Sequence, residues 1–207
     1  MVITFYGENC FKIQSGDTTI LIDPFSDQIG LTSPRLKPDI LVKTLTSFPV
    51  VLSPAYSARQ IIGPGEYNLK DIDIVGFELL KESTEKFIKT IYLMKIENIK
   101  VGFLGHLAGI LEPEILERFE EIDILFIPAG GSPFIEQKSA VKLIKQLEPK
   151  IVIPCLFKIP GLKRRADDVK EFIEEFNHQK PVPQEKLTIK KKDLEGIKKT
   201  EIVVLKI

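Results

Sequence analysis

The spacing of apolar residues changes along this chain, and that change limits the folds that it can form. Up to about residue 104, apolar side chains gather in short runs with strand-like spacing, separated by glycine, proline and polar turns. Strands are predicted at residues 2–6, 10–13, 19–22, 72–79, 90–96 and 100–104. Glu97 and Asn98 form a tight hairpin turn between the last two. The first half is therefore predicted to be mostly β-sheet.

The second half alternates strands with helices. Pro113 suits the first turn of a helix, in which Leu116 and Phe119 share one face. Two more helices are predicted, at residues 136–147 and from Asp167 onward, together with strands at 122–127, 150–154, 187–189 and 201–206. This pattern indicates an α/β or α+β arrangement, in which few helices cover a good deal of sheet.

Size and charge restrict the class of protein. The chain has 207 residues, 43% of them apolar, so a single domain over residues 1–207 can bury a substantial core. Its 29 basic and 29 acidic side chains cancel, which argues against a nucleic-acid or membrane partner. No apolar run approaches the roughly 20 residues that cross a bilayer, and no secretory signal is seen. We expect a cytoplasmic protein in which Cys10 and Cys155 are free, reduced thiols.

The segment after residues 40–42 decides the functional interpretation. Those three apolar residues are typical of a buried strand, and the carboxyl end of such a strand usually carries the chemistry of an α/β sheet. Here residues 43–49 supply Lys43, three hydroxyl side chains, Phe48 and Pro49, without a carboxylate, thiol or imidazole. This strand end has no evident catalytic chemistry of its own.

Turn motifs along the chain occur in a characteristic order. They are Tyr6-Gly7-Glu8-Asn9-Cys10-Phe11, Ile22-Asp23-Pro24-Phe25, Gly63-Pro64-Gly65-Glu66-Tyr67, Leu104-Gly105-His106-Leu107, Ile127-Pro128-Ala129-Gly130-Gly131 and Ile153-Pro154-Cys155-Leu156-Phe157-Lys158. Together they resemble the metallo-β-lactamase superfamily, in its small lactonase-like branch of zinc-dependent hydrolases. The resemblance covers nearly the whole chain. It implies a four-layer αββα sandwich with metal held by loops along one sheet edge.

The resemblance also marks where metal ligands would stand. The family's ligand positions fall on Thr44, Thr46, Phe48, Pro49, His106 and Leu156. Zinc needs three or four nitrogen, sulfur or carboxylate ligands, and this chain has two histidines, His106 and His178, the second beyond the third helix. The resemblance therefore implies that the ligand motif is lost and that no cofactor is bound. We also expect the apolar Phe48 and Leu156 to plug the pocket.

A residual pocket is predicted around the remaining polar groups. Glu8, Asp23 and His106 are candidate ligands for a single metal ion, and His106 is alternatively a general base or a hydrogen-bonded structural histidine. Gly130 and Gly131 either offer backbone amides to an anion or form a tight turn. Cys155 completes the candidates, although its apolar neighbours predict a buried thiol with a raised pKa. The basic run at residues 163–165 either contacts phosphate or is solvated, and we expect it to be solvated.

Three functions follow as hypotheses. The one favoured by the sequence is a catalytically degenerate member of the fold, retained as a ligand-binding or protein-assembly module. The alternative is a metal-dependent hydrolase, lactonase or phosphodiesterase-like, with an atypical site around His106 and zinc as cofactor. The third is a binder of small phosphorylated or anionic ligands through the glycine turns and Lys158. The sequence identifies no ligand, protein partner or oligomeric state.

Overall fold

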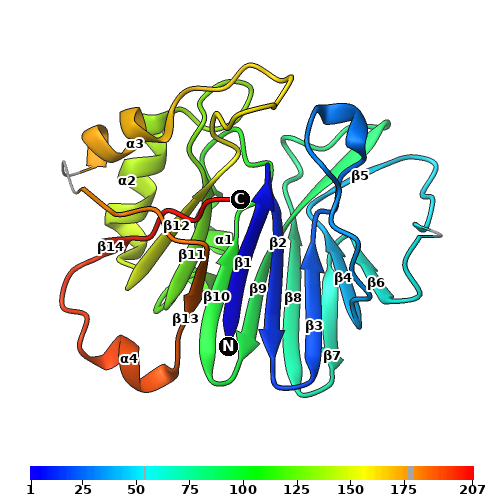
Figure 1. Ribbon diagram of the computed structural model, residues 1–207, viewed down its shortest axis with the longest axis horizontal. Coiled ribbons are helices and arrows are strands. Elements are labelled where there is room, and N and C mark those ends of the chain that lie inside the picture. The colour runs from blue at the N-terminus through cyan, green and yellow to red at the C-terminus, as the bar shows by residue number, and fades with distance from the viewer. Residues whose placement is uncertain (54, 177–179) are drawn as a thin grey trace.

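Two β-sheets form the body of the molecule in the computed structural model, which describes residues 1–53, 55–176 and 180–207 (Figure 1). The first sheet has six strands in the order β13 (Lys186–Thr188), β1 (Val2–Gly7), β2 (Cys10–Ser15), β3 (Thr18–Ile22), β4 (Ile40–Lys43) and β6 (Arg59–Ile62). The second has eight strands in the order β14 (Glu201–Ile202), β12 (Ile151–Cys155), β11 (Ile124–Pro128), β10 (Ile99–Phe103), β9 (Phe87–Ile96), β8 (Ile72–Glu78) and β7 (Gly65–Leu69), with β5 (Leu45–Ser47) pairing with β9 off this path.

The core lies between the two sheets, because each strand turns one row of apolar side chains inward. Strand β1 shows this alternation of buried and partly exposed residues. Phe11 of the first sheet packs edge-on against Phe126 of the second, with ring centroids 4.6 Å apart, and Phe126 stacks on Phe103 at 4.2 Å. These rings join the two inner faces into one apolar core.

The helices are few. They are η1 (Asp27–Ile29), α1 (Pro113–Arg118), α2 (Gln137–Leu147), α3 (Val169–Phe176) and α4 (Lys191–Glu195). Helices α2 and α3 lie side by side near β11 and β12 (Figure 1), and α2 buries Ala140, Val141, Leu143, Ile144 and Leu147. The apolar stripe expected on the second helix is thus confirmed, as is the two-sheet α/β class with few helices. No helix among the described residues is long and apolar enough to span a membrane.

Some expected elements differ from those observed. The Gly63–Tyr67 turn is shorter than expected, since β7 begins at Gly65 and runs on as a polar edge strand with no fully buried residue. The late strand is confined to Glu201–Ile202, and helix α4 was not predicted because it has only five residues. His178 lies outside the described residues. Strands β10, β11 and β12 are parallel neighbours, so their carboxyl ends meet at one edge of the second sheet.

Candidate functional site

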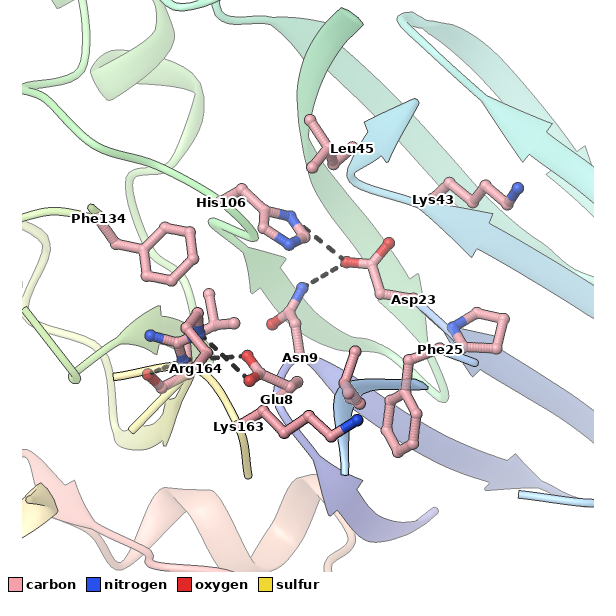
Figure 2. Close-up of a pocket in the computed structure, with 13 residues that line it drawn as sticks. Glu8, Asn9, Asp23, Phe25, Lys43, Leu45, His106, Phe134, Lys163 and Arg164 are labelled. Carbon is pink, nitrogen blue, oxygen red and sulfur yellow. Dashed lines mark hydrogen bonds and ion pairs between the residues drawn. The ribbon is translucent and has the colours of Figure 1, made fainter. Parts of the chain in front are cut away.

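A pocket of about 490 Å³ opens where loops from both sheets meet (Figure 2). The loop after β1 contributes Glu8 and Asn9, the end of β3 contributes Asp23, and the loop after β10 contributes His106. The remaining lining residues are Pro24, Phe25, Ile29, Lys43, Leu45, Phe134, Leu156, Lys163 and Arg164. Residues distant in sequence thus converge on one cavity.

Thr44 links Asp23 to His106 beneath this pocket. Its amide donates a hydrogen bond of 2.7 Å to Asp23 Oδ1, and its hydroxyl donates a short bond to Asp23 Oδ2. The same hydroxyl oxygen lies 2.8 Å from His106 Nδ1. Thr44 is buried. Asp23 Oδ2 and His106 Nδ1 lie 3.9 Å apart, which is too far for a hydrogen bond between them. The threonine is therefore the direct connection between the carboxylate and the imidazole.

This chain of contacts fixes the tautomer of His106. A hydroxyl has one proton, and here Asp23, which as a carboxylate can only accept, receives it. His106 Nδ1 must then donate to Thr44 Oγ1, which leaves Nε2 unprotonated in the neutral ring. Burial lowers the pKa of His106, against an opposing effect of Asp23, so the neutral ring is favoured. Nε2 is thereby left with a free lone pair.

Asn9 contributes a second free acceptor. Its amide Nδ2 donates to Asp23 Oδ2 at 2.5 Å, which fixes the amide orientation, while its buried Oδ1 has no partner among the described residues. Asn9 is 1% exposed, so an unsatisfied carbonyl oxygen there costs about 1–3 kcal/mol unless a bound group satisfies it. Asn9 lies below His106 in the pocket (Figure 2). A buried oxygen without a partner among the described residues thus lies beside the pocket that His106 lines.

The opposite wall is a fixed ion pair. Arg164 binds the Glu8 carboxylate in a bidentate manner, through Nε at 3.2 Å and Nη2 at 3.0 Å, and donates a 2.7 Å bond to the carbonyl of Leu156. Its guanidinium also lies over the Phe134 ring, 5.0 Å from the centroid. The Glu8 carboxylate is thus already engaged by a cation.

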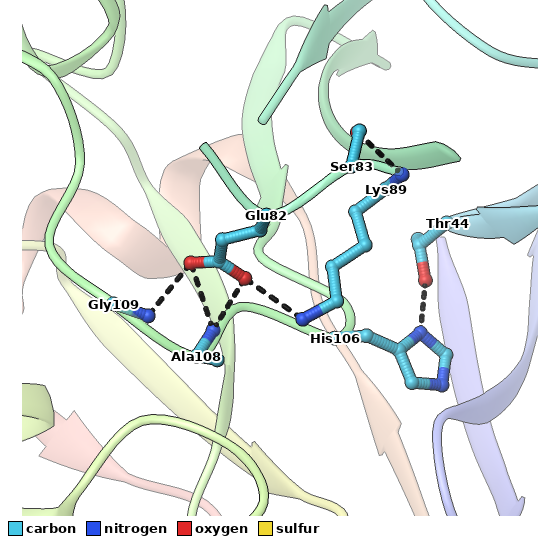
Figure 3. Close-up of polar contacts among 7 residues, drawn as sticks. All are labelled: Thr44, Glu82, Ser83, Lys89, His106, Ala108 and Gly109. Atoms are coloured by element: carbon cyan, nitrogen blue, oxygen red, sulfur yellow. Dashed lines mark hydrogen bonds and ion pairs between the residues drawn. The ribbon is translucent and has the colours of Figure 1, made fainter. Parts of the chain in front are cut away.

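A second carboxylate holds the loop that follows His106 (Figure 3). Glu82 accepts backbone hydrogen bonds from Ala108 and, at 2.7 Å, from Gly109, and it pairs with Lys89 at 2.8 Å. Both side chains of the pair are largely buried, so the contact is better shielded from solvent than a surface ion pair. Glu82 therefore anchors the loop that carries His106.

Unusual backbone conformations gather at this site. Glu8, Asp23 and Leu156 have φ values of 55°, 39° and 57°, in the left-handed region that side chains rarely adopt. Leu156 is the least expected of them, because a bulky apolar residue gains no local hydrogen bond there. Such strain often persists at functional sites, where surrounding contacts determine it.

The structure brings several predicted residues together. Glu8, Asp23, His106 and Leu156 line the pocket, and Thr44 lies beneath it. The predicted residual pocket does not extend to Gly130, Gly131 or Cys155, none of which lines the cavity. A Cβ at Gly130 would collide with the Leu156 carbonyl, so Gly130 serves close backbone packing. Cys155 is fully buried with a raised pKa, as expected.

The other predicted ligand positions lie outside the cavity lining. Thr46 is buried on β5, its hydroxyl has no partner in the part of the chain that the structure describes, and Pro49 follows a cis peptide bond. The expectation that Phe48 plugs the pocket is wrong: Phe48 follows the last residue of β5, is 47% exposed and does not line the cavity. Leu156 does reach the pocket. The loss of the metal-ligand motif stays a prediction.

Sequence reasoning missed some residues of the site. Asn9 belonged to a quoted motif but was not singled out, and Leu45 and Phe134 carry no chemical signal. Arg164 was expected to be solvated, which is wrong, because Glu8 and Phe134 hold it at the pocket. A partly buried acidic partner 156 residues away in sequence leaves no local trace. The run of basic residues at 163–165 was the sequence signal that could have pointed to a cation at the pocket.

Comparisons with known proteins connect this geometry to a family. A family model described as a Beta-lactamase superfamily domain matches residues 2–156. A UPF0173 metal-dependent hydrolase of Listeria monocytogenes is 21% identical over 191 residues, which cover 74% of this chain and 84% of the relative. A UPF0173 protein of Pyrococcus abyssi is 24% identical over 177 residues, which cover 74% and 82%.

A solved structure resembles the chain over almost its whole length. A Thermotoga maritima protein, proposed to be a Zn-dependent hydrolase of the metallo-beta-lactamase superfamily, superposes with a TM-score of 0.80 at 28% identity and covers 99% of this chain and 97% of its own. A metallo hydrolase from Ignicoccus hospitalis has the same fold, with a TM-score of 0.66 at 16% identity and coverage of 98% and 94%.

These findings correct two expectations from the sequence. The degenerate binding or assembly module is wrong as the favoured function, because the Listeria relatives are named metal-dependent hydrolases and the Thermotoga protein belongs to the same functional class by name. The absence of a cofactor is wrong for the same reason, since these names point to a metal. The alternative hypothesis, a metal-dependent hydrolase with an atypical site, is the better supported one.

The donor atoms decide what kind of metal this pocket fits. Among residues 1–53, 55–176 and 180–207, no three His, Cys, Asp or Glu side chains form a group that could hold an ion. Asp23 is engaged by Thr44 and Asn9, and Glu8 by Arg164. The free donors are His106 Nε2 and Asn9 Oδ1. They do not fit a dinuclear histidine-rich centre. A single divalent ion bound at His106 would take most of its ligands from water.

Proposed function

Because the chain belongs to the beta-lactamase superfamily, we propose that it is a metal-dependent hydrolase of lactone or phosphodiester bonds with an atypical site around His106. One observation carries this proposal: the contacts of Asp23, Thr44 and His106 leave an unprotonated Nε2 at the pocket, and a buried Asn9 oxygen without a partner among the described residues lies beside it. A structural histidine would need no such second acceptor beside it.

His106 and Asn9 are the residues that would hold the ion. When bound, a divalent ion polarises a carbonyl or phosphoryl oxygen and lowers the pKa of water. Thr44 keeps the proton of His106 on Nδ1, so that Nε2 stays available as a donor atom. Asp23 binds Asn9 directly and His106 through Thr44. It is therefore the common anchor of the two side chains that would hold the ion.

The rest of the pocket positions the substrate. Arg164 and Glu8 form a fixed ion pair on one wall, and Arg164 also donates to the carbonyl of Leu156. Leu45 and Phe134 supply apolar surface next to His106, which reduces the water around the reacting bond. The pocket thus offers a fixed ion pair and a partly apolar wall.

The proposal is tested by metal analysis and hydrolysis together. The protein is purified with zinc, manganese or iron supplied, its metal content is measured, and it is assayed on γ-lactones and bis(p-nitrophenyl) phosphate. We expect metal-stimulated hydrolysis, and His106→Ala is expected to reduce both bound metal and rate by roughly 100-fold or more. Lys142→Gln, an exposed change on α2, is the matched control and keeps full activity. Hydrolysis that is unchanged in His106→Ala, or absent with every metal, overturns the proposal.

A further inference from the structure

Strand β5 pairs with β9 along one of its two edges. The amide of Thr90 donates to the carbonyl of Thr44 at 2.8 Å, and this bond fixes which residues of β5 face β9. In an antiparallel pair, residues that exchange both backbone bonds alternate with residues that exchange none. Thr46 is therefore bonded to β9, whereas Leu45 and Ser47 turn their backbone groups away from it. These two amides and two carbonyls have no hydrogen-bond partner among the residues that the structure describes.

A cavity of about 590 Å³ lies beside the same two residues of β5. Leu45 and Ser47 are both exposed, and they line the cavity together with His106 and Phe134. The other lining residues are Lys86, Phe87, Lys89 and Pro133. His106 contacts Thr44, the residue that precedes β5 (Figure 3). The unpaired edge thus begins next to His106 and borders an open cavity.

A run of exposed apolar side chains follows β5. It consists of Phe48, Val50, Val51 and Leu52, and Val51 is the most exposed of them at 69%. Single apolar residues on a surface are normal, but a contiguous patch usually marks a contact with another molecule. Lys86, whose carbonyl accepts the Phe48 amide, has no carboxylate at ion-pair distance among the described side chains. Free backbone groups, apolar surface and an unpaired cation thus occur together.

We propose that β5 binds an extended peptide by adding it as an antiparallel strand beside His106. The free groups of Leu45 and Ser47 are donors and acceptors in alternation, and an extended backbone supplies the complementary set at the same spacing. Pro133 and Phe134 also line the cavity, so the space beside β5 is enclosed, which favours a single strand over the edge of a second folded copy. This binding adds to the proposed hydrolysis and does not depend on a bound metal.

The geometry also selects side chains of the peptide. The peptide residues opposite Leu45 and Ser47 place their side chains on the cavity face, because directly opposed residues of a sheet share a face. Phe87 and Phe134 line that cavity, so apolar side chains suit both positions. The peptide residue before them lies toward Lys86, where an acidic side chain gains most.

A short peptide tests the inference by binding alone. The probe is acetyl-aspartyl-leucyl-alanyl-valinamide, with leucine opposite Ser47 and valine opposite Leu45. One matched form is N-methylated at the valine amide, which points to β5, and the other at the alanine amide, which points away. By NMR titration of the metal-free protein, we expect the first form to bind roughly 10-fold or more weakly than the parent and the second to bind within about twofold of it.

Hydrogen exchange locates the peptide on the native chain. At a peptide concentration about ten times its dissociation constant, the amides of Leu45 and Ser47 should exchange about 10-fold more slowly. The amide of Thr46, which is already bonded to β9, should not change. Ser47→Pro removes one free amide without removing a bond to β9 and should weaken peptide binding roughly 10-fold. Lys142→Gln, on the exposed side of α2, should leave binding unchanged.

Three results would overturn the inference. They are absence of peptide binding, equal affinity of the two methylated forms, and exchange at Leu45 and Ser47 that saturating peptide does not slow. Protection of these amides that rises with protein concentration, without peptide, also overturns it and assigns the edge to a second copy of the chain. Peptide binding by a protein without hydrolytic activity supports the inference and counts only against the proposed function, so the two failures are distinguishable.

Discussion

Replacing Thr44 by valine tests the contacts on which the site depends. Valine has nearly the same shape as threonine, so the change removes the hydroxyl and little else. Asp23 Oδ2 loses a short hydrogen bond, and His106 Nδ1 loses its partner at 2.8 Å. Because Thr44 is 1% exposed, water cannot easily replace either contact.

The expected loss of stability can be worked from these two bonds. A hydrogen bond to a charged group contributes about 1.5–3 kcal/mol, and one between neutral groups about 0.5–1.5 kcal/mol, so Thr44→Val should cost roughly 2–4 kcal/mol. For a chain of 207 residues this corresponds to a fall in Tm of roughly 5–15 °C. Thr44→Ser keeps the hydroxyl and should lose far less.

The position of the proton on the His106 ring would not change if Thr44 had a purely structural role, so measuring it tests the proposed role. Nitrogen NMR of the imidazole should place the proton of His106 on Nδ1 in the native chain and in Thr44→Ser, and on a mixture of both nitrogens in Thr44→Val. Metal affinity should fall about 10–100-fold in Thr44→Val, as is usual when a partner that orients a ligand is removed. An unchanged Tm together with an unchanged His106 tautomer would refute the reasoning.

Three further predictions follow from the surroundings of the site. Glu82→Gln should weaken the anchor of Ala108 and Gly109 by about 1–2 kcal/mol, and hydrogen exchange at those two amides should speed up; unchanged exchange would contradict the anchoring role. Gly105→Ala should lower Tm, because Gly105 has φ 51° and an added Cβ would collide with Thr44, and an unaltered melting curve would count against this packing. Burial raises the pKa of the Cys10 and Cys155 thiols, so above the unfolded pKa of about 8.5 each thiol should reduce stability by about 1.4 kcal/mol per pH unit. Stability falls as pH rises because the unfolded chain binds fewer protons than the folded chain in this range. Urea unfolding between pH 8 and 10 measures the slope, and stability that rises with pH would oppose the prediction.

Much of the fold could be predicted from the sequence because strands and helices have local signatures. Alternation in β1, the apolar stripe of α2 and the turn motifs are all properties of neighbouring residues. They also support the family, which the match over residues 2–156 then shows. Among the elements that were missed, β7 is a polar edge strand and α4 is a helix of five residues, and both have little periodicity to detect.

Less could be predicted from the sequence about the site than about the fold. Glu8, Asp23 and His106 could be named in advance, because the turn motifs place them at strand ends. Their roles could not be named. The contact of Thr44 with His106 spans 62 residues, and that of Glu8 with Arg164 spans 156. No local pattern records such contacts.

The sequence by itself thus determined the layers, the family and the scarcity of histidine at the strand ends. Only the tertiary structure decided that Thr44 holds a tautomer, that Asn9 keeps a free buried oxygen, and that Phe48 points outward instead of into the pocket. The physical reason is that local structure depends on the order of neighbouring residues, whereas a site depends on which loops the folded sheets bring to the same edge.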